Sequence, residues 1–124
     1  MKKKIIILGS TGSIGKSLIN ILDKDKKSFE IVLLTVNKNI KELRKQIKKF
    51  KVKNVIITNQ EKFIKFKKKF KNSKINVFND FKLLEKILRK KKIDYTMNAI
   101  TGLVGLDPTL RVIKFTKNIA IANK

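Results

Sequence analysis

Short apolar runs alternate along this chain with segments in which apolar residues recur every three or four positions. An uninterrupted run of Ile, Val and Leu is typical of a strand buried on both faces, whereas the longer spacing is typical of a helix with one buried side. The runs predict strands at residues 4–8, 29–36, 54–58, 75–78, 93–99 and 118–122.

The segments between these runs predict helices. They are expected at residues 13–23, around Leu43, Ile47 and Phe50, around Phe63, Phe66 and Phe70, around Phe81, Leu84, Ile87 and Leu88, and at residues 106–115. Pro108 fits the first turn of the last helix, where an N–H group has no helical partner. Strands that alternate with amphipathic helices specify a parallel sheet covered on both faces. We therefore expect an α/β fold, a doubly wound, Rossmann-like parallel sheet in one domain of residues 1–124.

The composition excludes several kinds of chemistry, because the chain contains neither cysteine nor histidine. Disulfides, thiolate metal sites and cysteine nucleophiles are ruled out, and so are the commonest general base and transition-metal ligand. No apolar run approaches the roughly 18 to 20 residues that cross a bilayer, and the run at residues 5–8 is shorter than the apolar part of a signal peptide. We expect a cytoplasmic protein without a membrane partner.

The formal net charge of +23, from 32 basic and 9 acidic residues, raises the alternative of a nucleic-acid-binding module. Only Arg44, Arg89 and Arg111 are arginines, however, whereas proteins that recognise nucleic acids usually rely on the planar guanidinium group. An AT-rich coding sequence would produce many lysines, and these can lie on solvated helix faces. The phenylalanine stripe, Phe63, Phe66 and Phe70 on one face of a predicted helix, is more typical of a hydrophobic core than of a surface that stacks on bases. We therefore expect no nucleic-acid partner, although this charge attracts polyanions, including the phosphates of a dinucleotide.

A glycine-rich turn, Gly9–Gly15, follows the first predicted strand and opens the first predicted helix, and it holds three of the five glycines in the chain. A tight strand-to-helix turn needs a residue that tolerates positive φ, and a pyrophosphate approaches closely only where side chains are absent. The N–H groups that begin a helix then bind the phosphates. Thr11 and Ser13 add hydroxyl donors. The turn predicts nucleotide binding; the alternative is a simple connection without a ligand.

The residues after the second predicted strand favour NADP over NAD. The turn has the spacing G-x-x-G-x-x-G, not the G-x-G-x-x-G typical of NAD sites. NAD enzymes usually place an acid after the second strand to hold the ribose 2′-hydroxyl, but here Asn37, Lys38 and Asn39 follow it. A carboxylate would repel a 2′-phosphate, whereas these side chains can bind one. The missing acid supports this inference more than Lys38, which is one lysine among many.

Two further segments follow later strands at the same expected edge of the sheet. Residues 99–106 form a second glycine turn that is expected near the nicotinamide, and Asn123 and Lys124 follow the last strand. Their position alone does not distinguish a site from an ordinary strand end.

Together GSTGSIG, NKN, NAITGLVGLDPTL and the terminal IANK resemble, in order and over the whole chain, the 1-deoxy-D-xylulose 5-phosphate reductoisomerase family. The resemblance implies NADPH as cofactor and a reaction of the non-mevalonate isoprenoid pathway, in which 1-deoxy-D-xylulose 5-phosphate is rearranged and reduced to 2-C-methyl-D-erythritol 4-phosphate. The implied cofactor-binding residues are Thr11, Gly12, Ser13, Ile14, Asn37, Lys38, Asn39 and Asn123, and the implied residue that contacts the sugar-phosphate substrate is Lys124. Asn37 replaces a glycine often found in the family, so its role is less well supported.

The family's metal-binding carboxylates, catalytic domain and C-terminal domain follow the Asn-Lys pair and are not among these 124 residues. The resemblance therefore implies an NADPH-binding domain, apparently truncated, with no catalytic or metal-binding residue of its own. A divalent metal, Mg²⁺ or Mn²⁺, and a homodimer are expected only for the full-length enzyme. We expect the isolated chain to bind NADP(H) weakly and not to turn over.

Other functions stay open on the sequence alone. Another NADP reductase or a sugar-nucleotide epimerase would have a similar first turn, but the epimerases expect a Tyr-x-x-x-Lys pair, and Ala99 stands at the fourth position after Tyr95. A basic nucleic-acid-binding module would leave the glycine turn unexplained. A stand-alone nucleotide-sensing domain would have the turn without a catalytic half.

Overall fold

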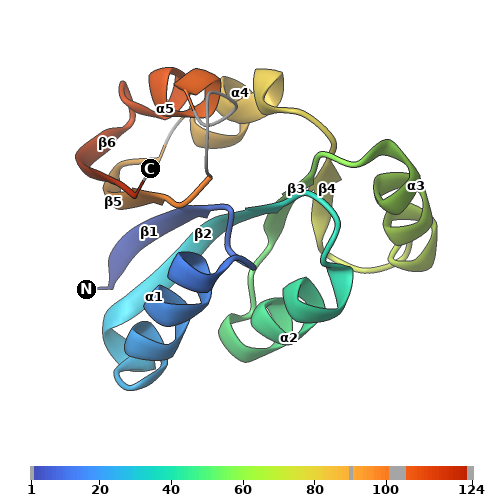
Figure 1. The fold of residues 1–124 in the computed structure, drawn as a ribbon, viewed down its shortest axis with the longest axis horizontal. Helices are drawn as coiled ribbons and strands as arrows, with labels where there is room; N and C mark the ends of the chain where they lie inside the picture. The colour runs from blue at the N-terminus through green and yellow to red at the C-terminus, as the bar shows by residue number, and fades with distance from the viewer. Residues whose placement is uncertain (1, 90, 101–105, 123–124) are drawn as a thin grey trace.

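The fold is a six-stranded parallel sheet between two layers of helices (Figure 1). The computed structural model describes residues 2–89, 91–100 and 106–122. The strands are β1 (Lys3–Leu8), β2 (Phe29–Val36), β3 (Asn54–Ile57), β4 (Asn76–Phe78), β5 (Ile93–Asn98) and β6 (Thr116–Ile121). The helices are α1 (Ser13–Asp23), α2 (Ile40–Phe50), α3 (Gln60–Lys69), α4 (Leu84–Leu88) and α5 (Leu106–Val112), with short 3₁₀ turns η1 (Lys26–Ser28) and η2 (Phe81–Leu83).

The strand order β4-β3-β2-β1-β5-β6 confirms the predicted doubly wound α/β fold. Every neighbouring pair is parallel. The chain starts at β1, moves outward to β4, and then crosses to the other side of β1 to form β5. The strand order therefore reverses beside β1. In open parallel sheets, ligands bind beyond the carboxyl ends of the strands at such a reversal.

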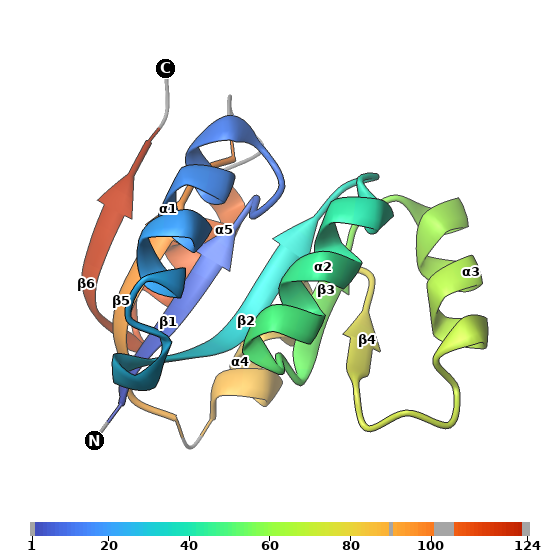
Figure 2. The same ribbon diagram turned by 90° about the horizontal axis from the view of Figure 1, so that it is seen from below.

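Each face of the sheet packs against its own layer of helices (Figures 1 and 2). Ile5 and Ile7 belong to a core with residues of α1, α2 and α3, whereas Ile6 and Leu8 belong to a second core with residues of α4 and α5. Side chains alternate along a strand, so both faces of β1 must be apolar, and this is why its sequence is an unbroken apolar run.

A β-bulge interrupts the pairing of β1 with β2. Ile5 pairs with Ile31 but Ile6 pairs with Leu33, so Val32 is the extra residue. The buried side chain of Asn54 donates a hydrogen bond to the carbonyl oxygen of Val32 over 3.2 Å. The carbonyl of this extra residue, which is displaced from the regular pattern of hydrogen bonds between the strands, thus has a hydrogen-bond donor.

Most predicted elements are confirmed, among them the helix at residues 13–23 and the strand at residues 29–36. The phenylalanine stripe is core: Phe66 is buried and its ring stacks on that of Phe70, with centroids 4.4 Å apart. The prediction of a helix through residue 115 is wrong, since α5 ends at Val112 and β6 begins at Thr116. Residues 113–115 form a turn, in which the N–H of Phe115 donates to the Val112 carbonyl (2.9 Å), and the Phe115 carbonyl accepts a hydrogen bond from the Ile93 N–H (2.9 Å), so pairing with β5 begins directly after the turn.

No helix in the described part of the chain has both the length and the apolar character needed to cross a membrane.

Candidate functional site

The glycine turn lies, as predicted, between the carboxyl end of β1 and the start of α1, and it is fastened to β2. The N–H of Gly9 donates to the backbone oxygen (3.1 Å) and the hydroxyl (2.9 Å) of Thr35, and the N–H of Ser10 donates to the same backbone oxygen (2.9 Å). Gly9 has a φ of 77°, in the left-handed region that favours glycine. These bonds fix the first half of the turn.

Gly12 and Gly15 have different surroundings. A Cβ on Gly15 would lie 2.5 Å from the carbonyl oxygen of Gly9 and 2.7 Å from backbone carbons of Ser10, so α1 lies directly against the turn. A Cβ on Gly12 would meet nothing nearer than the Gly9 oxygen at 4.0 Å. Gly15 thus allows close packing inside the turn, whereas Gly12 leaves the helix N-terminus open to approach.

The N-terminus of α1 offers unpaired N–H groups. The first hydrogen bond of the helix runs from the N–H of Lys16 to the carbonyl of Gly12 over 2.8 Å. The N–H groups of Ser13, Ile14 and Gly15 precede it and have no partner within the helix. Gly12 is the N-cap and has no side chain to accept from them. With the helix dipole, these groups suit an anion.

A cavity of about 560 Å³ adjoins the turn, within the usual size range of small-molecule sites. It is lined by Gly9, Thr11, Gly12, Thr35, Val36, Asn37, Thr58, Phe81, Ala99 and Ile100. These residues belong to the glycine turn, to the end of β2 and the residue after it, to the segments that follow β3 and β5, and to η2. The cavity therefore lies at the carboxyl edge of the sheet, beside the reversal at β1.

The structure brings several of the predicted cofactor-binding residues to this cavity. Thr11, Gly12 and Asn37 line it, and Ser13 and Ile14 begin the helix next to Gly12. Asn123 and Lys124 lie outside the described residues, and so do residues 101–105 of the second glycine turn.

The asparagines that follow β2 use their side-chain oxygens inside the protein. The Asn37 oxygen accepts a hydrogen bond from the hydroxyl of Thr58 (3.0 Å). The Asn39 oxygen accepts from the N–H of Glu42 (3.2 Å) and so caps α2. These bonds orient each side chain, whose NH₂ group is a donor that can serve a ligand. Asn37, Lys38 and Asn39 are all exposed.

Three groups of this site were not predicted from the sequence. Thr35 and Thr58 could have been found, because one is the last residue but one of the second strand and the other follows the third. Phe81 was assigned to a helix core, and nothing in its spacing indicates that it also lines the cavity. Gln46 was not considered at all, although its side-chain nitrogen lies 2.9 Å from the carbonyl oxygen of Ser10.

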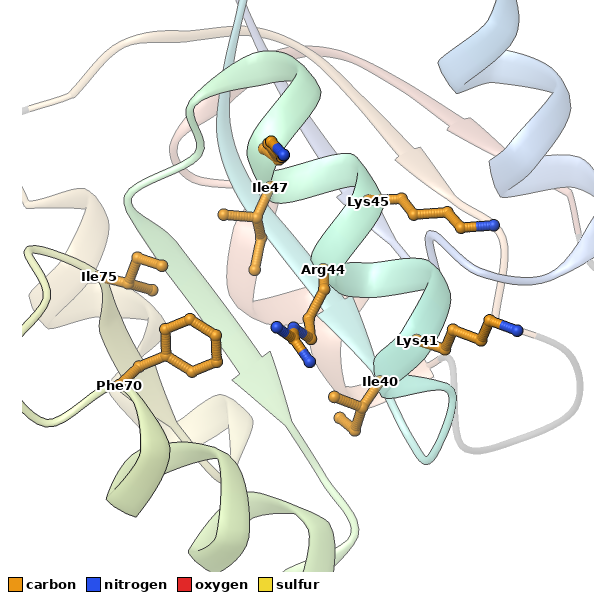
Figure 3. A pocket seen from close by; sticks show the side chains of 8 residues that line it. Ile40, Lys41, Arg44, Lys45, Ile47, Phe70 and Ile75 are labelled. Carbon is orange, nitrogen blue, oxygen red and sulfur yellow. The ribbon is translucent and has the colours of Figure 1, made fainter.

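A second cavity, of about 670 Å³, lies between α2 and the chain that follows α3 (Figure 3). Ile40, Ile47, Phe70 and Ile75 line it, and the Arg44 guanidinium lies 5.5 Å from the centre of the Phe70 ring. In Figure 3, neighbouring lysines of α2 extend away from Phe70. This cavity contains no part of the glycine turn, so the smaller cavity is the candidate cofactor site.

Known proteins match this chain closely. The sequence model of the 1-deoxy-D-xylulose 5-phosphate reductoisomerase family matches residues 5–124. The enzyme of that name from Pelagibacter ubique is 59% identical over 123 residues, which are 98% of this chain and 32% of that protein. The enzyme from Caldanaerobacter subterraneus is 43% identical over 122 residues, 98% of this chain and 31% of that protein.

A solved structure agrees with these matches. The 1-deoxy-D-xylulose 5-phosphate reductoisomerase from Zymomonas mobilis in complex with NADPH is similar with a TM-score of 0.86 and 28% identity, over 99% of this chain and 32% of that chain. The chain thus spans about a third of the length of the curated relatives it matches. Since the family's sequence model covers all but the first residues, this chain belongs to the 1-deoxy-D-xylulose 5-phosphate reductoisomerase family.

Proposed function

We propose that this chain binds NADPH with its pyrophosphate at the glycine turn. The proposal rests above all on the N–H groups of Ser13, Ile14 and Gly15, which begin α1 without a helical partner beside the open approach at Gly12. A pyrophosphate only accepts hydrogen bonds and carries negative charge, so these amides fit it. The relative from Zymomonas mobilis, whose structure is a complex with NADPH, supports the choice of cofactor.

We assign the 2′-phosphate of NADPH to Asn37, Lys38 and Asn39. Both asparagines have NH₂ groups to donate, and their side chains are oriented by the hydrogen bonds that their oxygens accept within the protein. Lys38 is exposed and adds a cation. No acidic residue lines the described cavity, so the 2′-hydroxyl of NADH would lack its usual carboxylate partner. We expect Asn123 to contact the cofactor and Lys124 the substrate.

Within the longer enzyme, we propose that residues 1–124 form the cofactor-binding domain for the conversion of 1-deoxy-D-xylulose 5-phosphate to 2-C-methyl-D-erythritol 4-phosphate. Bound NADPH supplies the hydride in that reaction. This domain holds the cofactor's phosphates at the turn, while Phe81, Ala99 and Ile100 contribute carbon atoms to the wall of the cavity. We place the protein in the cytoplasm.

The described residues do not fit a metal site, since they contain no group of three or more Asp, Glu, His or Cys side chains that could hold an ion. In line with the family resemblance, we propose that the divalent metal, the catalytic groups and the dimer contacts belong to the part of the family that this chain does not match.

Titration of the chain with NADPH and with NADH, followed by cofactor fluorescence, tests the proposal. We expect NADPH to bind at least about tenfold more tightly, roughly 1.4 kcal/mol. No conversion of 1-deoxy-D-xylulose 5-phosphate by the isolated chain is expected, and any measurable turnover would contradict the assignment of the catalytic groups. Equal affinity for the two cofactors would remove the assignment of the 2′-phosphate.

The charge of +23 favours one competing function, a nucleic-acid-binding module. Duplex DNA added to the NADPH titration distinguishes the two. A nucleic-acid-binding module would bind DNA with an affinity that falls steeply with salt and would not respond to NADPH.

A further inference from the structure

Gln46 of α2 is a buried polar residue that contacts the glycine turn. Its side chain is 3% exposed, and its Nε2 donates a hydrogen bond to the carbonyl oxygen of Ser10 over 2.9 Å. Ser10 is fully buried. A carbonyl can only accept, so the amide must present its nitrogen here. The bond joins residues 36 positions apart, and no part of the glycine motif includes Gln46.

This bond restrains one peptide plane of the turn. The N–H of Ser10 is held by Thr35 and its carbonyl by Gln46. The peptide that joins Ser10 to Thr11 is planar and trans, so the N–H of Thr11 points opposite to the Ser10 carbonyl, away from Gln46. Thr11 itself lines the cavity beside the turn.

We propose that Gln46 is a positioning residue for the cofactor, because it fixes the Ser10–Thr11 peptide with the Thr11 N–H oriented to donate to the pyrophosphate. The inference rests on the proposed NADPH site. A donor that is already oriented loses no freedom when the ligand binds, so its hydrogen bond contributes fully to affinity. Without Gln46, this peptide can rotate, and the conformational entropy that is lost when the cofactor orders the peptide opposes binding.

The incomplete hydrogen bonding of Gln46 argues against a purely structural role. Among the described residues, the Oε1 of Gln46 and the Oγ of Ser10 are buried without a hydrogen-bond partner. A buried polar atom without a partner lowers stability, and an apolar side chain of the same shape avoids that cost. Packing of α2 alone would thus be served as well by Met or Leu, whereas only a donor can hold the Ser10 carbonyl.

The test compares Gln46→Met with Ile47→Val in the 124-residue chain. Met keeps the length of the side chain without the donor. Ile47 is the next residue of α2, 8% exposed, and its shortening loosens the same helix without touching the turn. At a temperature where circular dichroism shows both variants folded, we expect the NADPH dissociation constant to rise about tenfold in Gln46→Met and less than twofold in Ile47→Val.

A spectroscopic measurement isolates the orienting role. In ¹H–¹⁵N spectra of the unaltered chain, NADPH should shift the Thr11 amide strongly, and in Gln46→Met this shift should be mostly lost. If Gln46→Met does not fold, Gln46→Asn replaces it, because that side chain keeps the amide but is one methylene too short.

Three results would overturn the inference while the proposed NADPH site stands. They are unchanged affinity in Gln46→Met, equal weakening in both variants, and a Thr11 amide that does not respond to NADPH in the unaltered chain. If the unaltered chain binds no NADPH, the proposed function itself fails and the inference with it.

Discussion

Alanine at Gly12 and at Gly15 should have different effects, on NADPH binding and on stability respectively, although the two glycines lie three residues apart in one turn. At Gly15 the new Cβ would lie 2.5 Å from the Gly9 oxygen, whereas a carbon contact of this kind is comfortable at about 3.5 Å. Helix and turn must separate by about 1 Å, because the atoms in the way belong to the backbone. Overpacking of this kind costs about 1–3 kcal/mol, a large fraction of the roughly 5–15 kcal/mol that stabilise a typical domain.

At Gly12 the same methyl group meets no atom nearer than 4.0 Å, and the backbone has φ −75° and ψ 175°, which any residue adopts. Alanine lowers the entropy of the unfolded chain and so gains about 0.4–1 kcal/mol. It is a poorer N-cap than glycine by roughly 0.5–1 kcal/mol. The two contributions nearly cancel. The methyl group does, however, occupy the approach to the amides of α1, and we expect NADPH affinity to fall at least tenfold, about 1.4 kcal/mol.

Urea denaturation and fluorescence titration with NADPH, performed on both variants, measure the two quantities separately. Gly12→Ala should unfold at nearly the same urea concentration as the unaltered chain but bind NADPH weakly. Gly15→Ala should unfold at a lower urea concentration than the unaltered chain. Its binding of NADPH should weaken only to the extent that fewer molecules are folded and that the geometry of the turn is altered. Equal stability losses, or normal NADPH binding by Gly12→Ala, would refute the assignment of Gly12 as the point of phosphate approach.

Three further predictions concern the residues after β2. Lys38→Glu should weaken NADPH at least about tenfold and change NADH less than threefold, since only NADPH has the 2′-phosphate; similar losses for both cofactors in parallel titrations would contradict its role. Asn39→Ala and Asn59→Ala each remove an N-cap, of α2 and α3 respectively, and each should cost about 1 kcal/mol in urea unfolding, but only Asn39→Ala should also weaken NADPH. Raising the salt concentration from about 0.05 to 0.5 M should weaken NADPH more than NADH, because screening acts on the additional charge; a salt-independent ratio of affinities would argue against a 2′-phosphate contact with Lys38.

The sheet was predictable because its strands are buried on both faces. β1, β2 and β3 each contain a short, unbroken apolar run, at residues 5–8, 31–34 and 55–57, which favours a strand buried on both faces, and the glycine turn is fixed by its place between such a strand and an amphipathic helix. These are local patterns. The end of α5 was not predictable in the same way, because Val112 to Phe115 continue the helical spacing and only the pairing with β5 overrides it.

The parts of the site that sequence analysis missed depend on contacts between distant segments. Gln46 stands among lysines on α2, and only the packing of that helix turns it inward to Ser10. Phe81 belongs to a segment whose spacing predicts burial, which it partly has, but the spacing cannot indicate that one edge of it lines a cavity. Neither the contact of Gln46 with Ser10 nor the place of Phe81 at the cavity can be predicted before the strand order is known.

The bulge at Val32 connects the pairing of the sheet to the cofactor site. Before it, residues of β1 pair with residues 26 positions later, as Ile5 does with Ile31; after it, Leu8 pairs with Thr35. Without the extra residue, Leu34 would pair with Leu8 in place of Thr35. The apolar side chain of Leu34, which now belongs to the core, would then replace the Thr35 hydroxyl that Gly9 contacts. Thr35 can hold the turn only because the register slips by one residue. The same slip sets how far Asn37 extends past the sheet edge, so the proposed contacts with the pyrophosphate and with the 2′-phosphate both depend on it.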